Sequence, residues 1–218
     1  IRAGAGIGTN GGSFAVNISE NNWLGDGKRV DLAFEVDAES LSGTLNFSDP
    51  NYDFLGNSIN YYISSQNNDK PDQGYENTII TSGINTGFEQ YKNVFTKLGI
   101  FTTYDDLKTN SSASSSLSKQ SGEFSELAGN YGFSYDGRDR SFMPTKGSIL
   151  GFEQSLPFYA DKSYLSNTLT YSKYSSFNEN VIGAGKLYIT TINGLNDDNV
   201  RLSKRKSLSS RRLRGFKK

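Results

Sequence analysis

Apolar and polar side chains alternate at every second position along most of this chain. Phe14, Val16 and Ile18 stand between serine, alanine and asparagine, and the same period recurs over 28–37 and 41–48. A β-strand turns successive side chains to opposite faces, so this period predicts strands with one apolar and one polar face. We predict eleven such strands, over residues 2–9, 13–20, 28–37, 41–48, 57–66, 76–87, 94–104, 125–135, 147–156, 163–174 and 181–191.

The connections between these strands are of two alternating kinds. One kind varies in length, from a tight step over 10–12 to a low-complexity, serine-rich stretch over 105–124. Many of the strands approach the roughly nine to eleven residues that cross a bilayer at a tilt. Short turns at one end and variable loops at the other are typical of an outer-membrane β-barrel. The other kind is short and rich in Asn, Asp, Gly, Pro and aromatic residues, over 21–27, 49–56, 88–93, 136–146 and 176–180.

Composition supports a polar-lined β-structure and argues against most enzymes. Only 34% of the 218 residues are hydrophobic although 13% are aromatic, and no run of about 18 apolar residues is present to form a membrane-spanning helix. The chain contains neither histidine nor cysteine, which excludes the usual catalytic triads and the commonest metal ligands. We therefore predict no enzymatic activity, no catalytic residues, no cofactor and no metal site.

Charge is balanced overall but unevenly distributed. Residues 201–218 hold nine basic residues and no acid, which leaves 14 basic against 23 acidic residues in 1–200. Such a tail often indicates a nucleic-acid-binding patch. Two acidic pairs, Asp105-Asp106 and Asp197-Asp198, are expected to be solvated loop acids rather than cation ligands.

Four motifs, in order, resemble the barrel domain of BamA-type assembly factors in the outer-membrane insertase superfamily, which is also described as the bacterial surface antigen barrel. The residues that carry the resemblance are Asn21-Asn22-Trp23-Leu24-Gly25-Asp26-Gly27, Asp49-Pro50-Asn51-Tyr52, Tyr135-Asp136-x-Arg138-Asp139-x-x-Phe142-x-Pro144-Thr145-x-Gly147 and Leu213-Arg214-Gly215-Phe216.

This resemblance implies an all-β fold, an incomplete antiparallel transmembrane β-barrel with about 11 strands of an expected 16. The chain opens without an initiator Met and is expected to be a fragment. Residues 1–191 would form the first barrel strands and 192–218 the start of the long sixth surface loop. The family inserts unfolded outer-membrane proteins into the bacterial outer membrane. The implied partners are those substrates, outer-membrane lipid and lipopolysaccharide, and accessory assembly lipoproteins, with no nucleic acid.

The resemblance and the residues together select three groups of candidate functional residues. The loop-tip motif is Leu213, Arg214, Gly215 and Phe216, and in the family its arginine bonds a carboxylate on a later strand inside the barrel. The first strand is a glycine-rich edge for pairing with substrate, formed by Ala3, Gly4, Ala5, Gly6, Ile7 and Gly8. The turn motifs contribute Asn22, Trp23, Leu24, Gly25, Gly27, Asp136, Arg138, Asp139, Pro144, Thr145 and Gly147.

The family reading also offers a role for the basic tail. The basic residues that lead into the loop tip, inside a lumen where other strands offer Asp and Glu, are Arg201, Lys204, Arg205, Lys206, Arg211 and Arg212. Two other functions stay open on the sequence alone. One is a passive porin-like channel or secretion transporter of the same superfamily, and the other is a soluble, carbohydrate-binding β-sandwich.

Overall fold

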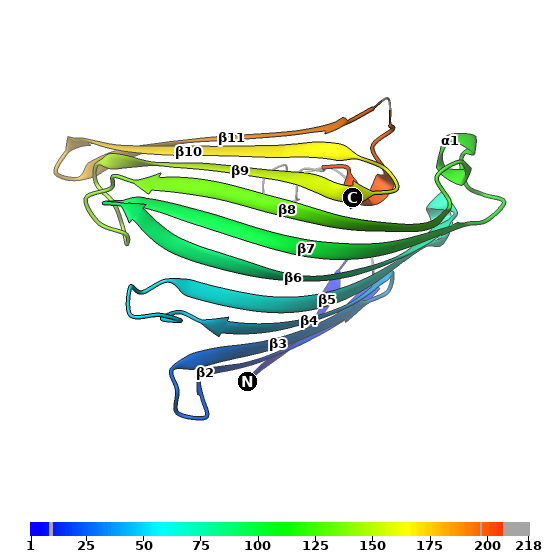
Figure 1. Cartoon of the computed structure of the whole chain (residues 1–218), viewed down its shortest axis with the longest axis horizontal. Coiled ribbons are helices and arrows are strands. Elements are labelled where there is room, and N and C mark those ends of the chain that lie inside the picture. Colours follow the sequence, from blue (N-terminus) through cyan, green and yellow to red (C-terminus); the bar gives the residue numbers. More distant parts are fainter. Residues whose placement is uncertain (9–10, 197, 207–218) are drawn as a thin grey trace.

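The computed structural model describes residues 1–8, 11–196 and 198–206, and its strands form one antiparallel sheet (Figure 1). The eleven strands follow one another in the sheet in chain order, so β1 and β11 lie at its two edges. The all-β class and the predicted strand number are confirmed. The strands are β1 (Arg2–Gly8), β2 (Gly11–Trp23), β3 (Lys28–Asp37), β4 (Ser40–Asp49), β5 (Ser58–Lys70), β6 (Tyr75–Tyr91), β7 (Val94–Thr109), β8 (Gly122–Asp136), β9 (Gly147–Ala160), β10 (Tyr164–Asn178) and β11 (Val181–Gly194).

Helical structure is confined, in the part of the chain that the structure describes, to three short turns. These are η1 (Pro71–Gln73), α1 (Ser115–Ser118) and η2 (Leu202–Lys204). No described helix is long and apolar enough to cross a membrane.

Most strands from β5 onward are longer than the alternation of apolar residues predicts. β7, for example, was expected over 94–104 but continues to Thr109, and β11 was expected over 181–191 but ends at Gly194. The added residues are mostly polar on both faces, so they carry no period-two signal. Their backbone ladder nevertheless continues, because each N–H and C=O still finds its partner on the neighbouring strand.

The register places the apolar residues of neighbouring strands in continuous rows on one face. Leu45 on β4 lies opposite Leu32 on β3 and Ile63 on β5, and Leu32 lies opposite Ile18 on β2. All four side chains are 40–50% exposed. Exposed apolar rows of this extent need an apolar environment, such as lipid or a partner surface.

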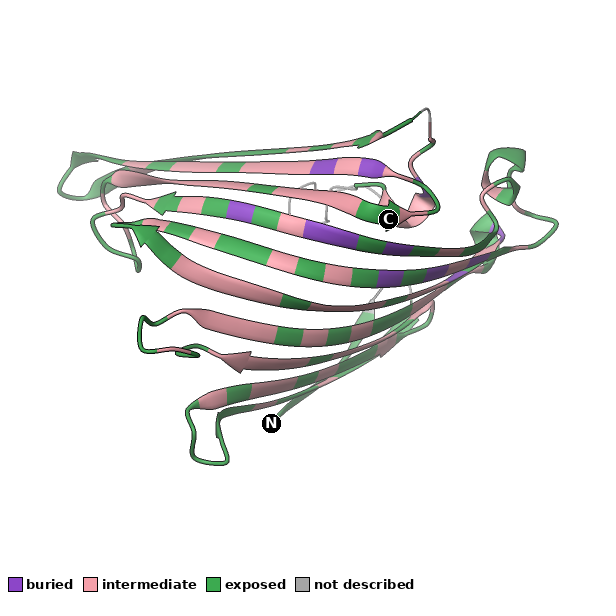
Figure 2. Ribbon diagram, viewed as in Figure 1, coloured by how far each residue is buried: buried purple, intermediate pink, exposed green. Residues whose placement is uncertain are grey.

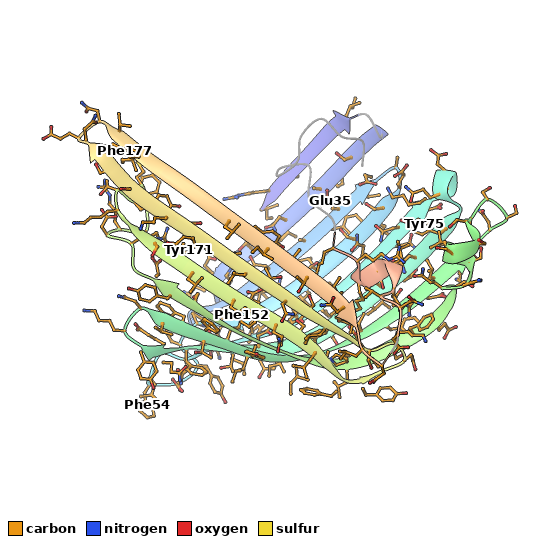
Figure 3. All side chains as sticks on the ribbon, turned by 90° about the horizontal axis from the view of Figure 1, so that it is seen from above. Glu35, Phe54, Tyr75, Phe152, Tyr171 and Phe177 are labelled. Carbon is orange, nitrogen blue, oxygen red and sulfur yellow. The ribbon has the colours of Figure 1, made fainter. Side chains whose placement is uncertain are left out.

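The opposite face of the sheet is polar and lines a trough. Seen from above, the sheet curves into a trough, and the segment that follows β11 lies within it (Figure 3). Followed from strand to strand, the register puts Glu35 of β3 on the same face as Asp105 of β7. Val30, Leu32, Phe34 and Val36 therefore face away from the acids Asp31, Glu35 and Asp37 that alternate with them, as the sequence predicts.

Few side chains are fully buried. Leu107, Ala128 and Tyr164 are the only buried hydrophobic residues among those described. Figure 2 shows that buried positions concentrate on β7, β8 and β10, close to the segment after β11. The sheet thus has no apolar core of its own, and its most enclosed region is a polar one at a single end of the trough.

Connections at the two ends of the sheet differ, as expected. The turns after β2, β4, β6, β8 and β10 lie at one end, and the opposite end carries the loop 110–121 with α1 (Figure 1). The expected loop over 105–124 is therefore too long, because Asp105 and Asp106 belong to β7 and residues 122–124 to β8.

Candidate functional site

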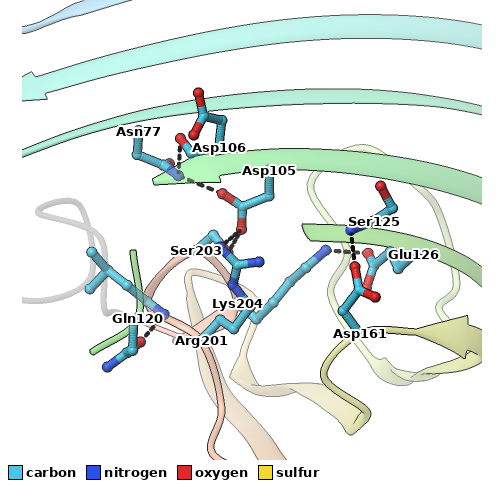
Figure 4. Close-up of polar contacts among 11 residues, drawn as sticks. Asn77, Asp105, Asp106, Gln120, Ser125, Glu126, Asp161, Arg201, Ser203 and Lys204 are labelled. Carbon is cyan, nitrogen blue, oxygen red and sulfur yellow. Dashed lines mark hydrogen bonds and ion pairs between the residues drawn. The ribbon is translucent and has the colours of Figure 1, made fainter. Parts of the chain in front are cut away.

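The candidate site is formed where residues 198–206 return from the edge of the sheet to the concave face of β7 and β8 (Figure 4). The backbone N–H of Leu195 donates to the Ser163 carbonyl at 2.9 Å, directly after β11. The Asp198 carboxylate then accepts from Lys162 Nζ at 2.9 Å and from the Ser163 N–H at 3.0 Å. The hydrogen bond from the Ser163 N–H and, to a smaller extent, the one from Lys162 hold the pKa of Asp198 below its usual range.

Asp105 of β7 is the centre of the site. Its carboxylate is buried and accepts hydrogen bonds from Asn77 Nδ2 at 2.6 Å and from the Ser203 hydroxyl. Arg201 Nη2 lies 3.2 Å from Asp105 Oδ2. Because a buried carboxylate without partners is strongly destabilising, this constellation fixes Arg201 and Ser203 to the wall.

Arg201 is itself only 7% exposed. Its guanidinium carbon lies 3.2 Å from the centroid of the Phe124 ring, so the cation is stacked on an aromatic face as well as paired. Burial lowers the pKa of Arg201, and the negative charges of Asp105, Asp161 and Glu126 oppose that shift. Nε and Nη1 of Arg201 are buried and have no hydrogen-bond partner among the described residues.

A second ion pair lies beside the first. Lys204 Nζ contacts Glu126 Oε1 on β8, and the Tyr164 hydroxyl donates to the same oxygen at 3.3 Å. Lys204 Nζ also lies 5.4 Å from the centroid of the Tyr164 ring. Glu126 and Tyr164 are both buried, so the Lys204 charge is held in an enclosed, aromatic-walled position.

The loop 110–121 holds the segment from another side. Gln120 Oε1 accepts from the backbone N–H of Leu202 at 3.0 Å. The Ser114 side chain accepts from the Leu117 N–H at the start of α1, which gives this serine-rich loop a local structure. We call the set Asp105, Glu126, Tyr164, Arg201, Ser203 and Lys204 the basic anchor.

The basic anchor suits mechanical attachment rather than chemistry. Its carboxylates are already bound by cations, hydroxyls and an amide. Across the described residues, no group of three or more potential metal ligands is present. The arrangement ties the segment 198–206 to the concave face of the sheet at one end.

The sequence predicted one half of the anchor and missed the other. Arg201 and Lys204 were expected to meet acids inside the barrel, and they do, at Asp105 and Glu126. The expectation of solvated loop acids was wrong for Asp105, which is buried, and for Asp198, which is bonded to Lys162 and Ser163. Continuing the alternation of β7 past residue 104 would have placed Asp105 on the polar face.

The turn motifs lie at the other end of the sheet and do not approach the anchor (Figure 1). In the first, Asn22 Oδ1 accepts from the Gly27 N–H at 2.7 Å, and Gly25 and Gly27 have φ of 84° and 70°, a conformation that glycine adopts readily. Trp23 and Leu24 are 45% and 83% exposed, as an anchor at a lipid boundary requires. Leu24 also has a positive φ of 58°, which its sequence does not indicate.

The turn between β8 and β9, over 137–146, is stabilised by its own polar side chains. Arg138 Nε and Nη2 donate to the two oxygens of Asp136 at 2.8 and 2.6 Å, so these residues form a bidentate ion pair across the turn. Asp139 accepts from the Thr145 hydroxyl at 2.5 Å and from the Thr145 N–H at 3.0 Å. Pro144 lies within this turn, and Gly147, with φ of 101°, opens β9.

The other predicted groups fall at the edge of the sheet or outside the described residues. Ala3, Gly4, Ala5, Gly6, Ile7 and Gly8 lie in β1, which pairs only with β2. The loop-tip motif Leu213, Arg214, Gly215 and Phe216 lies outside the described residues, as do Arg211 and Arg212. The edge strand, the turns and the anchor are therefore three separate places, not one converging site.

Comparison with known proteins identifies relatives. The family model described as the Omp85 superfamily domain matches residues 22–218. Among solved structures, the chain is similar to the one titled "The crystal structure of BamA from Haemophilus ducreyi lacking POTRA domains 1-3". The TM-score is 0.78 at 20% sequence identity, and the match covers 94% of this chain and 42% of that chain. At this identity the likeness concerns the fold, and the chain spans less than half the length of that relative.

Proposed function

Because this chain belongs to the Omp85 superfamily, we propose that it forms part of a non-enzymatic outer-membrane protein insertase that assembles β-barrel proteins in the bacterial outer membrane. The half-exposed apolar face would contact lipid, and the trough would form part of the barrel lumen. Residues after Gly194 would begin the long sixth surface loop, which the basic anchor attaches to the lumenal wall. Unfolded outer-membrane proteins are the proposed substrates, with accessory lipoproteins as partners.

One observation carries this proposal: three of the seven residues of β1 are glycine, Gly4, Gly6 and Gly8, so this strand is weakly held against any neighbouring strand. An edge strand presents a row of N–H and C=O groups that can template an incoming strand. Gly4 has no atom within 4 Å of the place where a side chain would begin, so β1 is also loosely packed. Loose packing and a weakly specified register suit a strand that must accept and release different partners.

Cysteine cross-linking in the full-length protein tests this role, since these 218 residues contain no cysteine of their own. We expect Ala5→Cys on β1 to form disulfides with cysteines in the terminal strand of a substrate arrested during assembly. The matched control is Val16→Cys on β2, which lies opposite Ala3 on the same face as Ala5 and pairs with strands on both sides. Equal cross-linking at both positions would exclude templating by β1 and would leave a secretion transporter of the same superfamily as the better candidate.

The loop-tip motif has a separate proposed role. Arg214→Ala should impair assembly more than Arg211→Ala or Arg212→Ala, because a lumenal carboxylate that loses a bidentate arginine stays desolvated and unpaired. Arg214→Lys should restore assembly only in part, since an ammonium cannot reproduce the planar fork. Complementation of a strain depleted of its own insertase measures these effects. Equal, mild defects at the three positions would contradict this role for Arg214.

A further inference from the structure

A cleft of about 610 Å³ lies between the loop that carries α1 and the segment 198–206. Its volume falls in the range of small-ligand sites. Four cations line it, Lys119, Lys162, Arg201 and Arg205, together with the hydroxyl-bearing residues Ser115 and Ser116. No carboxylate is among the described residues that line this cleft, which we call the basic cleft.

The positive charge of the basic cleft is only partly compensated nearby. Lys162 is paired with Asp198, and Arg201 with Asp105, behind the cleft wall. Lys119 and Arg205 form no ion pair with any described residue, although Arg205 Nε donates weakly to the Val200 carbonyl at 3.4 Å. The following residues of the sequence, 207–218, add five cations and no acid, so they provide no carboxylate.

Arg201 gives independent evidence for an absent acceptor. Only 7% of its surface is exposed, yet Nε and Nη1 have no hydrogen-bond partner among the described residues. Buried polar groups in native proteins are nearly always satisfied, and an orphaned one is commonly explained by a bound water or ion. Both groups are donors, so the absent partner supplies acceptor oxygens, and the unpaired cations Lys119 and Arg205 of the same cleft favour a negatively charged one.

We propose that the basic cleft binds a phosphoryl group, with Lys119 and Arg205 as its exposed cations and Arg201 as its buried one. Guanidinium groups bind phosphate oxygens bidentately, and serine hydroxyls supply further donors. The cleft lies at the loop end of the sheet, which under the proposed function faces the outer leaflet. The phosphoryl group would then come from a phosphorylated glycolipid headgroup or from free phosphate. Only this choice of source rests on the proposed function.

The test uses full-length protein in maltoside micelles, which contain no phosphate. Inorganic phosphate is titrated by calorimetry in one arm. Lipid A is compared with its dephosphorylated form in the other. Binding should weaken by at least about tenfold in the double variant Lys119→Gln, Arg205→Gln, because each cation contributes a charge-assisted hydrogen bond. The matched control, Lys92→Gln with Lys146→Gln, removes the same charge from turns at the opposite end of the sheet and should bind like the parent protein.

Each outcome discriminates. Preference for lipid A over its dephosphorylated form supports a lipid source, and binding of inorganic phosphate without that preference supports a free anion. The Arg201 Nε–H resonance should shift on adding the ligand that binds. Failure of both ligands to bind, or equal affinity in the double variant and the control, would overturn the proposal. Since binding is measured in micelles without substrate, its failure would leave the cross-linking test of β1 unaffected.

Discussion

Replacement of Asp105 by asparagine should release the segment 198–206 from the wall of the sheet. Asparagine has nearly the same shape but no charge, so the buried Arg201 guanidinium would lose the carboxylate 3.2 Å away. Removing one partner of a buried ion pair costs about 3–5 kcal/mol. The segment can avoid this cost by detaching, so the balance between attached and detached states should shift by roughly a hundredfold or more.

Hydrogen exchange measures this shift at the backbone amides of Leu202 and Arg205, which donate to Gln120 and to the Leu202 carbonyl in the attached state. The matched control is Asp106→Asn, one residue away on the opposite face. The Asp106 side chain is 18% exposed and pairs with Lys108, whose side chain is 70% exposed, rather than with the segment 198–206. Because an ion pair with one solvated partner contributes about 1 kcal/mol or less and does not hold the segment, exchange at the two amides should be nearly unchanged.

Equal exchange in both variants, or two amides that stay protected in Asp105→Asn, would contradict this role of Asp105. A double variant sharpens the test. Adding Arg201→Gln to Asp105→Asn removes both charges, so its effect should be clearly smaller than the sum of the single effects. Additive effects would mean that Asp105 and Arg201 do not act as a pair.

Three further predictions concern the outward face of the sheet and the turn between β8 and β9. Phe34→Arg should lower the stability of the full-length protein in bilayers by about 2–4 kcal/mol near the midplane, measured by reversible urea unfolding; an unchanged midpoint would reverse the face assignment. The pKa of Asp139 is lowered to about 2, mainly by the hydrogen bond that the Thr145 hydroxyl donates to its carboxylate. Because this folded-state pKa is depressed, ionised Asp139 stabilises the fold above the unfolded pKa of about 4, and this stabilisation is lost as pH falls through about 2. An NMR titration in which Thr145→Ala left the pKa of Asp139 unchanged would contradict the assignment. Gly147→Ala should destabilise the turn by roughly 1–3 kcal/mol, since φ is 101° and the added Cβ would lie 2.2 Å from the Gly137 carbonyl oxygen. Gly185→Ala has open space and should be tolerated, and thermal unfolding of the two variants measures the difference.

The period-two pattern was sufficient to predict the strands and their faces because lipid-level positions must alternate in polarity. It stopped being informative where β5 and β7 leave the apolar band, since residues such as Asn68 and Lys108 are polar whichever way they point. The strand ends were therefore placed too early, and Asp105 was assigned to a loop. Backbone pairing, not side-chain polarity, decides where these strands end.

The basic anchor was beyond reach for a different reason. Ser203 and Asp105 are 98 residues apart, and Lys204 and Glu126 are 78 apart. The resemblance to the family predicted that the basic residues would meet acids inside the barrel, but not which acids, because several strands offer them on the same face. The positive φ of Leu24 and Met143 was equally hidden, since neither residue type favours that conformation.

The scarcity of buried apolar side chains makes the surrounding solvent a component of the fold. Leu107, Ala128 and Tyr164 are the only buried hydrophobic residues described, so under the proposed function most of the apolar contact area of the sheet is supplied by acyl chains. The free energy of a substitution on the outward face should therefore change with the thickness of the host bilayer, because hydrophobic mismatch enters the same equilibrium. A substitution in the basic anchor touches only protein and water, and its effect should be the same in thin and thick bilayers.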